Sequence, residues 1–182
     1  AFVRNYLDKS IKSPDELESK GASVLSWIPK IETIGKNGTS TPEFIVGNKS
    51  NSAASEAFKA LRTRIQFSRL ESEQLKTILV TSSIPFEGKT IVSSNLAGSF
   101  AQAGKKVLIM DCDLRKPRIH NVFETDKFPG LSDYLFTNVT LEDITRPTPM
   151  DNLHFITSGT IPPNPSELLG SVQMKQFINK LK

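Results

Sequence analysis

Residues 77–90 read TILVTSSIPFEGKT, and this stretch decides the predicted fold. Its first part, Thr77–Thr81, is a short apolar and β-branched run typical of a buried strand in a parallel sheet. The sequence Lys89–Ala103 predicts a helix that Gly104 ends as its C-cap. A second apolar run, Lys106–Met110, follows and predicts another strand. Strand, helix and strand at this spacing indicate a βαβ unit with a right-handed crossover.

The segment between the first strand and the helix, Ser83–Thr90, matches the phosphate-binding pattern G-x-x-x-x-G-K-[ST], with serine in place of the leading glycine. Backbone N–H groups of such a loop can bind the phosphates of a nucleotide, while Lys89 adds a cation and Thr90 offers a hydroxyl to Mg²⁺. An isolated Gly-Lys-Thr is most often an exposed turn, but this position favours nucleotide binding. A bulky Phe86 costs about 1–2 kcal/mol if its φ is positive, which leaves the affinity open. The residues predicted to contact the nucleotide are Ser83, Pro85, Phe86, Glu87, Gly88, Lys89, Thr90 and Ile91.

Two carboxylates, Asp111 and Asp113, follow the second predicted strand. Because side chains alternate along a strand, they are expected to share a face that looks into the ligand crevice at the carboxyl end of the sheet. Carboxylates there would repel a triphosphate unless Mg²⁺ lay between them, so we interpret the pair as metal-organising or proton-accepting groups. Capping of the following turn is the alternative, expected for one of them rather than both. Cys112 is expected to be a small buried residue, because flanking carboxylates raise the pKa of a thiol.

Other segments complete the predicted organisation. The helix of residues 52–70 places Ala54, Phe58, Leu61 and Ile65 on a core-facing stripe, with Glu56, Lys59 and Arg62 on the opposite side. The remaining predicted elements are a capped helix opening at Ser13–Glu16, a strand at Val24–Ile28, a flexible linker over residues 36–52, a strand at Leu153–Thr157 and a last helix at Val172–Leu181.

Composition excludes several classes of protein. The 182 residues carry a net charge of +4 without a basic arm, which disfavours a nucleic-acid-binding protein. The single cysteine excludes an internal disulfide, and no apolar run reaches the ~20 residues of a membrane helix. We expect a piece of a longer protein, because its first residue is Ala1 rather than Met, and we expect it to be cytoplasmic.

Several of these segments together resemble a known family, the bacterial tyrosine kinases (BY-kinases) of capsule and exopolysaccharide export, including the Wzc-like proteins. Residues Ser83–Thr90 resemble the Walker A motif of this family, and residues 107–117 (VLIMDCDLRKP) resemble its Walker A′ motif, which usually has alanine at position 112. Residues 158–159 followed by 162–169 (SG, then PPNPSELL) are similar to another family segment, and residues 7–14 with 24–25 and 28–29 resemble the segment just inside the second membrane helix. Residues 55–63 (SEAFKALRT) resemble the E-x-x-R-x-x-R oligomerisation helix, with Lys59 in place of the first arginine.

The resemblance implies a P-loop NTPase-like α/β fold, with a mostly parallel sheet and flanking helices, incomplete at its C-terminal side. It divides the chain into a juxtamembrane cytoplasmic segment (residues 1–35), the flexible linker (36–52) and a partial kinase domain (53–182). A Walker B strand ending in D-x-x-P and a tyrosine-rich tail are absent from the 182 residues, so an exposed sheet edge is expected and the fragment itself is expected to bind nucleotide weakly or be inactive.

The function implied is an ATP- and Mg-dependent protein-tyrosine autokinase in the cytoplasmic domain of an inner-membrane protein. In this scheme Lys89 contacts phosphates, Asp111 is the candidate base, and Thr90, Asp111 and Asp113 hold Mg²⁺, partly through water. The implied partners are a homo-oligomeric ring formed through Glu56, Lys59 and Arg62, the tyrosine-rich tail of a neighbouring subunit and the polysaccharide export machinery. Two alternatives stay open: a non-catalytic nucleotide-binding assembly module, and a partitioning-type ATPase, although residues 82–87 contain no extra lysine of the kind that ATPases usually carry.

Overall fold

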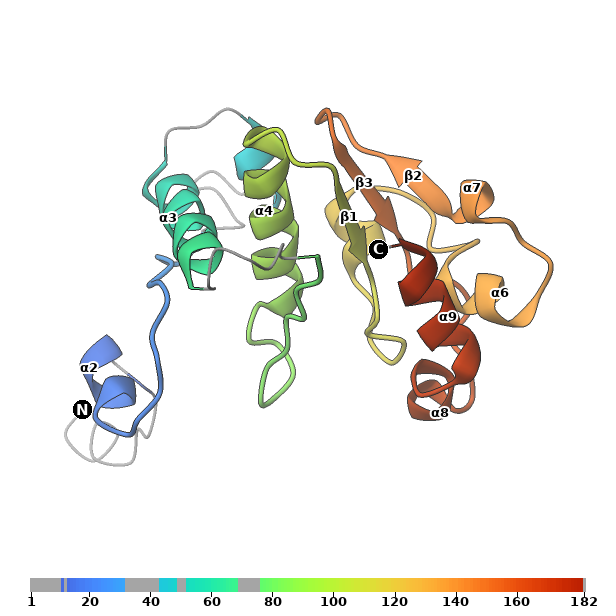
Figure 1. The fold of residues 1–182 in the computed structure, drawn as a ribbon, viewed down its shortest axis with the longest axis horizontal. Coiled ribbons are helices and arrows are strands. Elements are labelled where there is room, and N and C mark those ends of the chain that lie inside the picture. Colours follow the sequence, from blue (N-terminus) through green and yellow to red (C-terminus); the bar gives the residue numbers. More distant parts are fainter. Residues whose placement is uncertain (1–10, 12, 32–42, 49–51, 69–75, 182) are drawn as a thin grey trace, which may run out of the picture.

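The computed structural model describes residues 11, 13–31, 43–48, 52–68 and 76–181 (Figure 1). In chain order, the described elements are α2 (Pro14–Glu18), the 3₁₀ turn η1 (Val46–Asn48), α3 (Ala53–Phe67), α4 (Lys89–Gln102), β1 (Val107–Met110), α5 (Ile119–Val122), α6 (Leu131–Phe136), α7 (Leu141–Ile144), β2 (Thr145–Pro147), β3 (Leu153–Ile156), α8 (Pro165–Leu169) and α9 (Val172–Leu181).

The sheet has the strand order β1-β3-β2. β1 and β3 are parallel, with Val107 opposite Leu153, and β2 runs antiparallel to β3. Within the described residues the sheet is therefore mixed, and β1 and β2 are its edge strands. The sequence predicted β1 and β3 but not β2, because a three-residue strand that ends in proline has too short a pattern to detect.

The two faces of the sheet are covered by different helices (Figure 1). On one face, Ile109 and Phe155 pack with Ala97 and Ala101 of α4. The other face forms a larger cluster under the C-terminal helices, whose buried members are Leu114, Leu131, Ile144, Ile156, Leu168, Met174 and Phe177. This division follows from the alternation of side chains along each strand.

A further layer lies beyond α4, where α3 and the segment 43–48 pack against it. Phe58, Leu61 and Leu96 are buried in this layer together with Val46. The side chain of Asn95, which has no exposed surface, links the segment to α4: its Oδ1 accepts from the N–H groups of residues 45 and 46, and its Nδ2 donates to the carbonyl groups of residues 43 and 91. One buried amide thus satisfies four backbone groups between distant parts of the chain.

The predicted helix of residues 52–70 is confirmed as α3, with Ser52 as its N-cap accepting from the N–H of Ser55. The helices predicted at residues 89–103 and 172–181 are confirmed as α4 and α9. α2 begins at the predicted proline, but Ser13 makes no side-chain capping bond, so the predicted capping box is wrong.

Two predicted strands are wrong. Residues Thr77–Thr81 form no strand, and the side chain of Leu79 is 83% exposed, so the predicted βαβ unit lacks its first strand. Residues Val24–Ile28 also form no strand. A β-branched run becomes a strand only where a neighbour accepts its backbone hydrogen bonds, and no described strand pairs with either segment.

The predicted linker of residues 36–52 is partly a packed segment. Val46 is 1% exposed, and the ring of Phe44 lies against α4. The prediction of a flexible loop is therefore wrong for residues 43–48. Three apolar side chains in this segment are enough to pack it against α4. Residues 36–42 and 49–51 lie outside the described part of the chain.

None of the helices in the described residues combines the length and apolar character needed to cross a membrane.

The contacts of Asn95 generate a stability prediction. We expect Asn95→Ala to lower the free energy of unfolding by about 2–4 kcal/mol, because two backbone N–H groups lose their acceptor in a buried place. Ser93→Ala is the matched control, because that hydroxyl bonds only to Thr90 within the same helix, and we expect a change within about 0.5 kcal/mol. The measurement is urea unfolding, in which the slope of the free energy against urea concentration should stay unchanged. Equal losses of unfolding free energy in the two variants would contradict the role of Asn95 in linking segment 43–48 to α4.

Candidate functional site

The predicted phosphate-binding loop is a turn that leads directly into α4. Gly88 precedes the helix with a left-handed backbone (φ +84°), and Phe86 also has a positive φ (+66°). The loop is braced by Glu87, whose carboxylate accepts from the hydroxyl of Ser83 at 3.1 Å and from the N–H of Ile84 at 3.2 Å. These bonds, the one from Ile84 above all, lower the pKa of the Glu87 carboxyl, so the brace is ionised at neutral pH.

The start of α4 supplies the donors that an anion needs. The helix's Val92 N–H bonds to the carbonyl of Gly88 at 2.9 Å, while the N–H groups of Lys89, Thr90 and Ile91 lie in the first turn, where a helix lacks internal acceptors. Such a terminus favours negative charge through the helix dipole as well. The predicted residues of the loop are therefore brought together in a form that suits a phosphate group.

Lys89 lies opposite one of the two predicted carboxylates. Its Nζ is 4.0 Å from Oδ2 of Asp113, and both side chains are partly exposed. The other carboxylate oxygen of Asp113 accepts from the N–H groups of Arg115, at 3.3 Å, and Lys116, at 3.0 Å. Asp113 thus caps a turn with one oxygen and faces the phosphate-binding loop with the other.

Asp111 has a different environment. It is 5% exposed, and its oxygens accept from the N–H groups of Asp113 at 3.1 Å, Arg118 at 2.9 Å and Ile119 at 2.9 Å. Burial raises the pKa of this carboxyl, and the three donors oppose that shift. The expectation that only one of the two aspartates caps a turn is wrong, because both do. In this geometry Asp111 holds the chain between β1 and α5 in place, and the roles of base and metal ligand remain predictions for it.

Cys112 is half-buried and packs against the larger core cluster. Burial, together with the charge of Asp111, raises the pKa of its thiol to about 11. The thiol is therefore protonated at neutral pH, which agrees with a packing role rather than a nucleophilic one.

The residues present fit a magnesium ion that is held mainly by its substrate. Magnesium usually takes one or two carboxylates and completes its shell with phosphate oxygens and water. Asp113 and the hydroxyl of Thr90 are the suitable groups, and the described residues contain no cluster of three or more ligating side chains. The donor set is that of a nucleotide-dependent site rather than of a closed protein cage.

Two basic residues of the site were not predicted from sequence. Lys116 places its Nζ 5.3 Å from the centre of the Phe86 ring. Arg118 pairs with Glu43 at 2.7 Å and so ties the loop after β1 to the packed segment 43–48. Both lie within or beside the run that follows β1, but their partners are distant in sequence, so no local pattern could have identified them.

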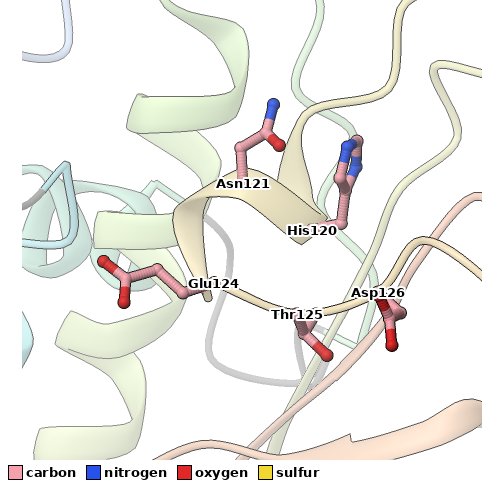
Figure 2. Close-up of a pocket in the computed structure, with 5 residues that line it drawn as sticks. All are labelled: His120, Asn121, Glu124, Thr125 and Asp126. Carbon is pink, nitrogen blue, oxygen red and sulfur yellow. The ribbon is translucent and has the colours of Figure 1, made fainter.

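A separate open hollow of about 590 Å³ lies at α5. Figure 2 shows its five lining residues, which come from α5 and the turn that follows it: His120, Asn121, Glu124, Thr125 and Asp126. Removal from water lowers the pKa of His120, so its imidazole is neutral at pH 7. The hollow does not contain the phosphate-binding loop or either predicted carboxylate.

The predicted oligomerisation residues lie on two sides of α3. Glu56 and Lys59 form an exposed ion pair at 2.7 Å. Arg62 instead reaches α4, where its Nη1 donates to the carbonyl of Ser99 at 2.7 Å. Its predicted place on a face directed away from the core is therefore wrong, because the long side chain bends back to an acceptor on the neighbouring helix.

Searches against known proteins place this chain among named kinases, although no family model matches it. It is 42% identical over 123 residues to the tyrosine-protein kinase YwqD of Bacillus subtilis and 35% identical over 193 residues to the tyrosine-protein kinase etk of Escherichia coli K12. The alignments cover 68% and 97% of this chain, but only 52% and 26% of those relatives.

Solved structures agree with these relatives. The kinase domain of the Escherichia coli tyrosine kinase ETK superposes with a TM-score of 0.82 at 35% identity, over 94% of this chain and 69% of that domain. The BceF tyrosine kinase domain gives the same TM-score at 32% identity, over 95% of this chain and 72% of that one. The predicted α/β fold of the P-loop NTPase type is confirmed by these matches.

The two aspartates generate a paired prediction. We expect Asp111→Asn to lower the free energy of unfolding by about 1–3 kcal/mol, because the amide cannot accept at both of its ends and leaves buried N–H groups unpaired. Asp113→Asn is the matched control, expected to cost less than about 1 kcal/mol because its partners lie at the surface. Urea unfolding of both variants is the measurement. A larger loss of unfolding free energy in Asp113→Asn than in Asp111→Asn would contradict the assignment of Asp111 as the structural carboxylate.

Proposed function

This chain belongs to the bacterial tyrosine-kinase family, and from that premise we propose that its protein transfers the γ-phosphoryl group of ATP to protein tyrosines. The observation that carries the proposal is the juxtaposition of the phosphate-binding loop and Asp113, with Lys89 Nζ 4.0 Å from the carboxylate. The similarity to solved kinase domains over 94% of the chain supports the same conclusion.

The proposed chemistry depends mainly on positioning and charge neutralisation. The N–H groups at the start of α4 and the ammonium of Lys89 bind the phosphates, and Thr90 and Asp113 are the groups that would hold Mg²⁺. When bound, that ion neutralises charge on the phosphate oxygens. The tyrosine oxygen forms the new bond to the γ-phosphorus, the bond to the β–γ bridging oxygen breaks, ADP leaves, and the hydroxyl proton passes to water. Asp111, predicted as the base, acts here as a positioning residue for the loop that carries Asp113.

The proposed acceptor is a tyrosine-rich tail on a neighbouring subunit. Tyr134, in the described part of the chain, lies in α6 with its ring centre 4.6 Å from that of Phe177. Because this ring is packed, Tyr134 is a poor phosphoryl acceptor. Following the family resemblance, we place the protein's kinase domain at the cytoplasmic side of the inner membrane, where it acts on capsule or exopolysaccharide polymerisation and export.

A ring of subunits is the proposed assembly, formed through the exposed side of α3. Glu56 and Lys59 present opposite charges at the surface and are the groups available to a neighbouring subunit. Arg62 supports the interface indirectly, because its bond to Ser99 fixes α3 on α4.

The activity is tested on the intact protein. We expect Lys89→Met to reduce phosphotyrosine formation at least about 100-fold, because the phosphate charge loses its cation in the site. Lys105→Met, at an exposed position between α4 and β1, is the control and is expected to keep the wild-type rate. Labelled ATP distinguishes the alternatives: label that appears only as inorganic phosphate indicates an ATPase, and nucleotide binding without turnover indicates an assembly module.

The assembly is tested separately by sedimentation velocity. We expect Glu56→Arg to shift the intact protein to smaller particles, because it places a like charge beside Lys59 where an ion pair stood. Glu142→Lys, a charge reversal at an exposed position of α7, should leave the particle mass unchanged. Intact particles in both variants would exclude this side of α3 from the interface.

A further inference from the structure

Phe86 combines two unfavourable features in one residue of the phosphate-binding loop. Its ring is 85% exposed, and its backbone has the left-handed φ of +66° that side chains rarely adopt. The left-handed φ can direct backbone N–H groups toward a phosphate, but the exposed ring has no part in that task. Strain of this kind concentrates at functional positions, so the ring itself needs an explanation.

One contact relates the ring to the run of residues that follows β1. The Nζ of Lys116 lies 5.3 Å from the ring centre, a cation–π distance. The N–H of Lys116 donates to Asp113, whose other oxygen faces Lys89. Lys116 therefore links Phe86 to Asp113, because its ammonium group approaches the ring while its backbone N–H binds the carboxylate.

The ring has room for a partner. In the described part of the chain, the aromatic rings that contact one another are Phe44–Phe123, Phe123–Phe155 and Tyr134–Phe177. None of these pairs includes Phe86. An ammonium group at one face and solvent over most of the ring leave it accessible to another aromatic side chain.

We propose that the ring of Phe86 is the stacking platform for the side chain of the acceptor tyrosine. This inference rests on the proposed function, in which a tyrosine hydroxyl must lie against the γ-phosphorus. The base of a nucleotide lies at the opposite end of its phosphate chain, so it is the acceptor and not the base that comes beside Asp113. Phe86 then acts as a specificity residue, favouring an aromatic acceptor over serine or threonine.

The test compares ring removal with ring retention in the intact kinase. Phe86→Leu keeps a bulky apolar side chain but removes the stacking face, whereas Phe86→Trp keeps a face. We expect Phe86→Leu to raise the KM for a tyrosine peptide about threefold to tenfold, the worth of one aromatic pair, and Phe86→Trp to stay within about twofold of wild type. The Kd for a fluorescent ATP analogue should change less than the peptide KM. Phe136→Leu, another exposed ring, is the control for general loss of apolar surface.

Two results would overturn the inference. Equal peptide KM values in Phe86→Leu and wild type would show that the acceptor does not use the ring. A rise in the nucleotide Kd with an unchanged peptide KM would assign the ring to the nucleotide. Failure of the proposed function is distinguishable, because wild type would then form no phosphotyrosine. In that case, anisotropy with a labelled peptide carrying phenylalanine for tyrosine still decides whether aromatic binding depends on Phe86.

Discussion

The burial of α4 on two sides is the constraint on which the rest of the structure depends. The helix lies between α3 and the sheet, and small residues let both layers approach it. A Cβ at Gly98 would come within 2.8 Å of the Phe44 ring, so the close approach of segment 43–48 requires glycine there. Because packing fixes α4 on both sides, the position of its N-terminus and of the attached loop is fixed as well. The N–H donors at this terminus are therefore pre-organised.

The two aspartates after β1 show how neighbouring groups of the same chemistry acquire different roles. Asp111 is buried among three backbone N–H groups and fixes the path of the chain toward α5. Asp113, two residues on, keeps one oxygen toward Lys89 at the surface. The inner carboxylate thereby orients the outer one, because its bond to the N–H of residue 113 sets the direction in which that residue leaves the strand. Truncating the inner group would affect the site through the backbone rather than through lost chemistry.

Long side chains connect the layers at their polar margins. Arg62 joins α3 to α4, Arg118 joins the loop after β1 to Glu43, and Lys116 approaches the ring of Phe86. Each of these cations spans elements that are far apart in sequence. Of these three cations only Lys116 approaches the phosphate-binding loop, and the ring of Phe86 in that loop stays exposed to solvent.

Sequence alone predicted the longer helices α3, α4 and α9 and the candidate site residues, because both depend on local patterns. The stripe of α3, the Gly-Lys-Thr at the start of α4 and the apolar runs of β1 and β3 are periodicities and motifs that a short window contains. Tertiary structure decided which apolar runs became strands, since Thr77–Thr81 has the composition of one but no described neighbour to pair with. It also decided that Arg62 faces α4 and that Asp111 faces inward. The acceptor of Arg62 lies on another helix, and the burial of Asp111 depends on all layers at once, so neither can be derived from a local pattern.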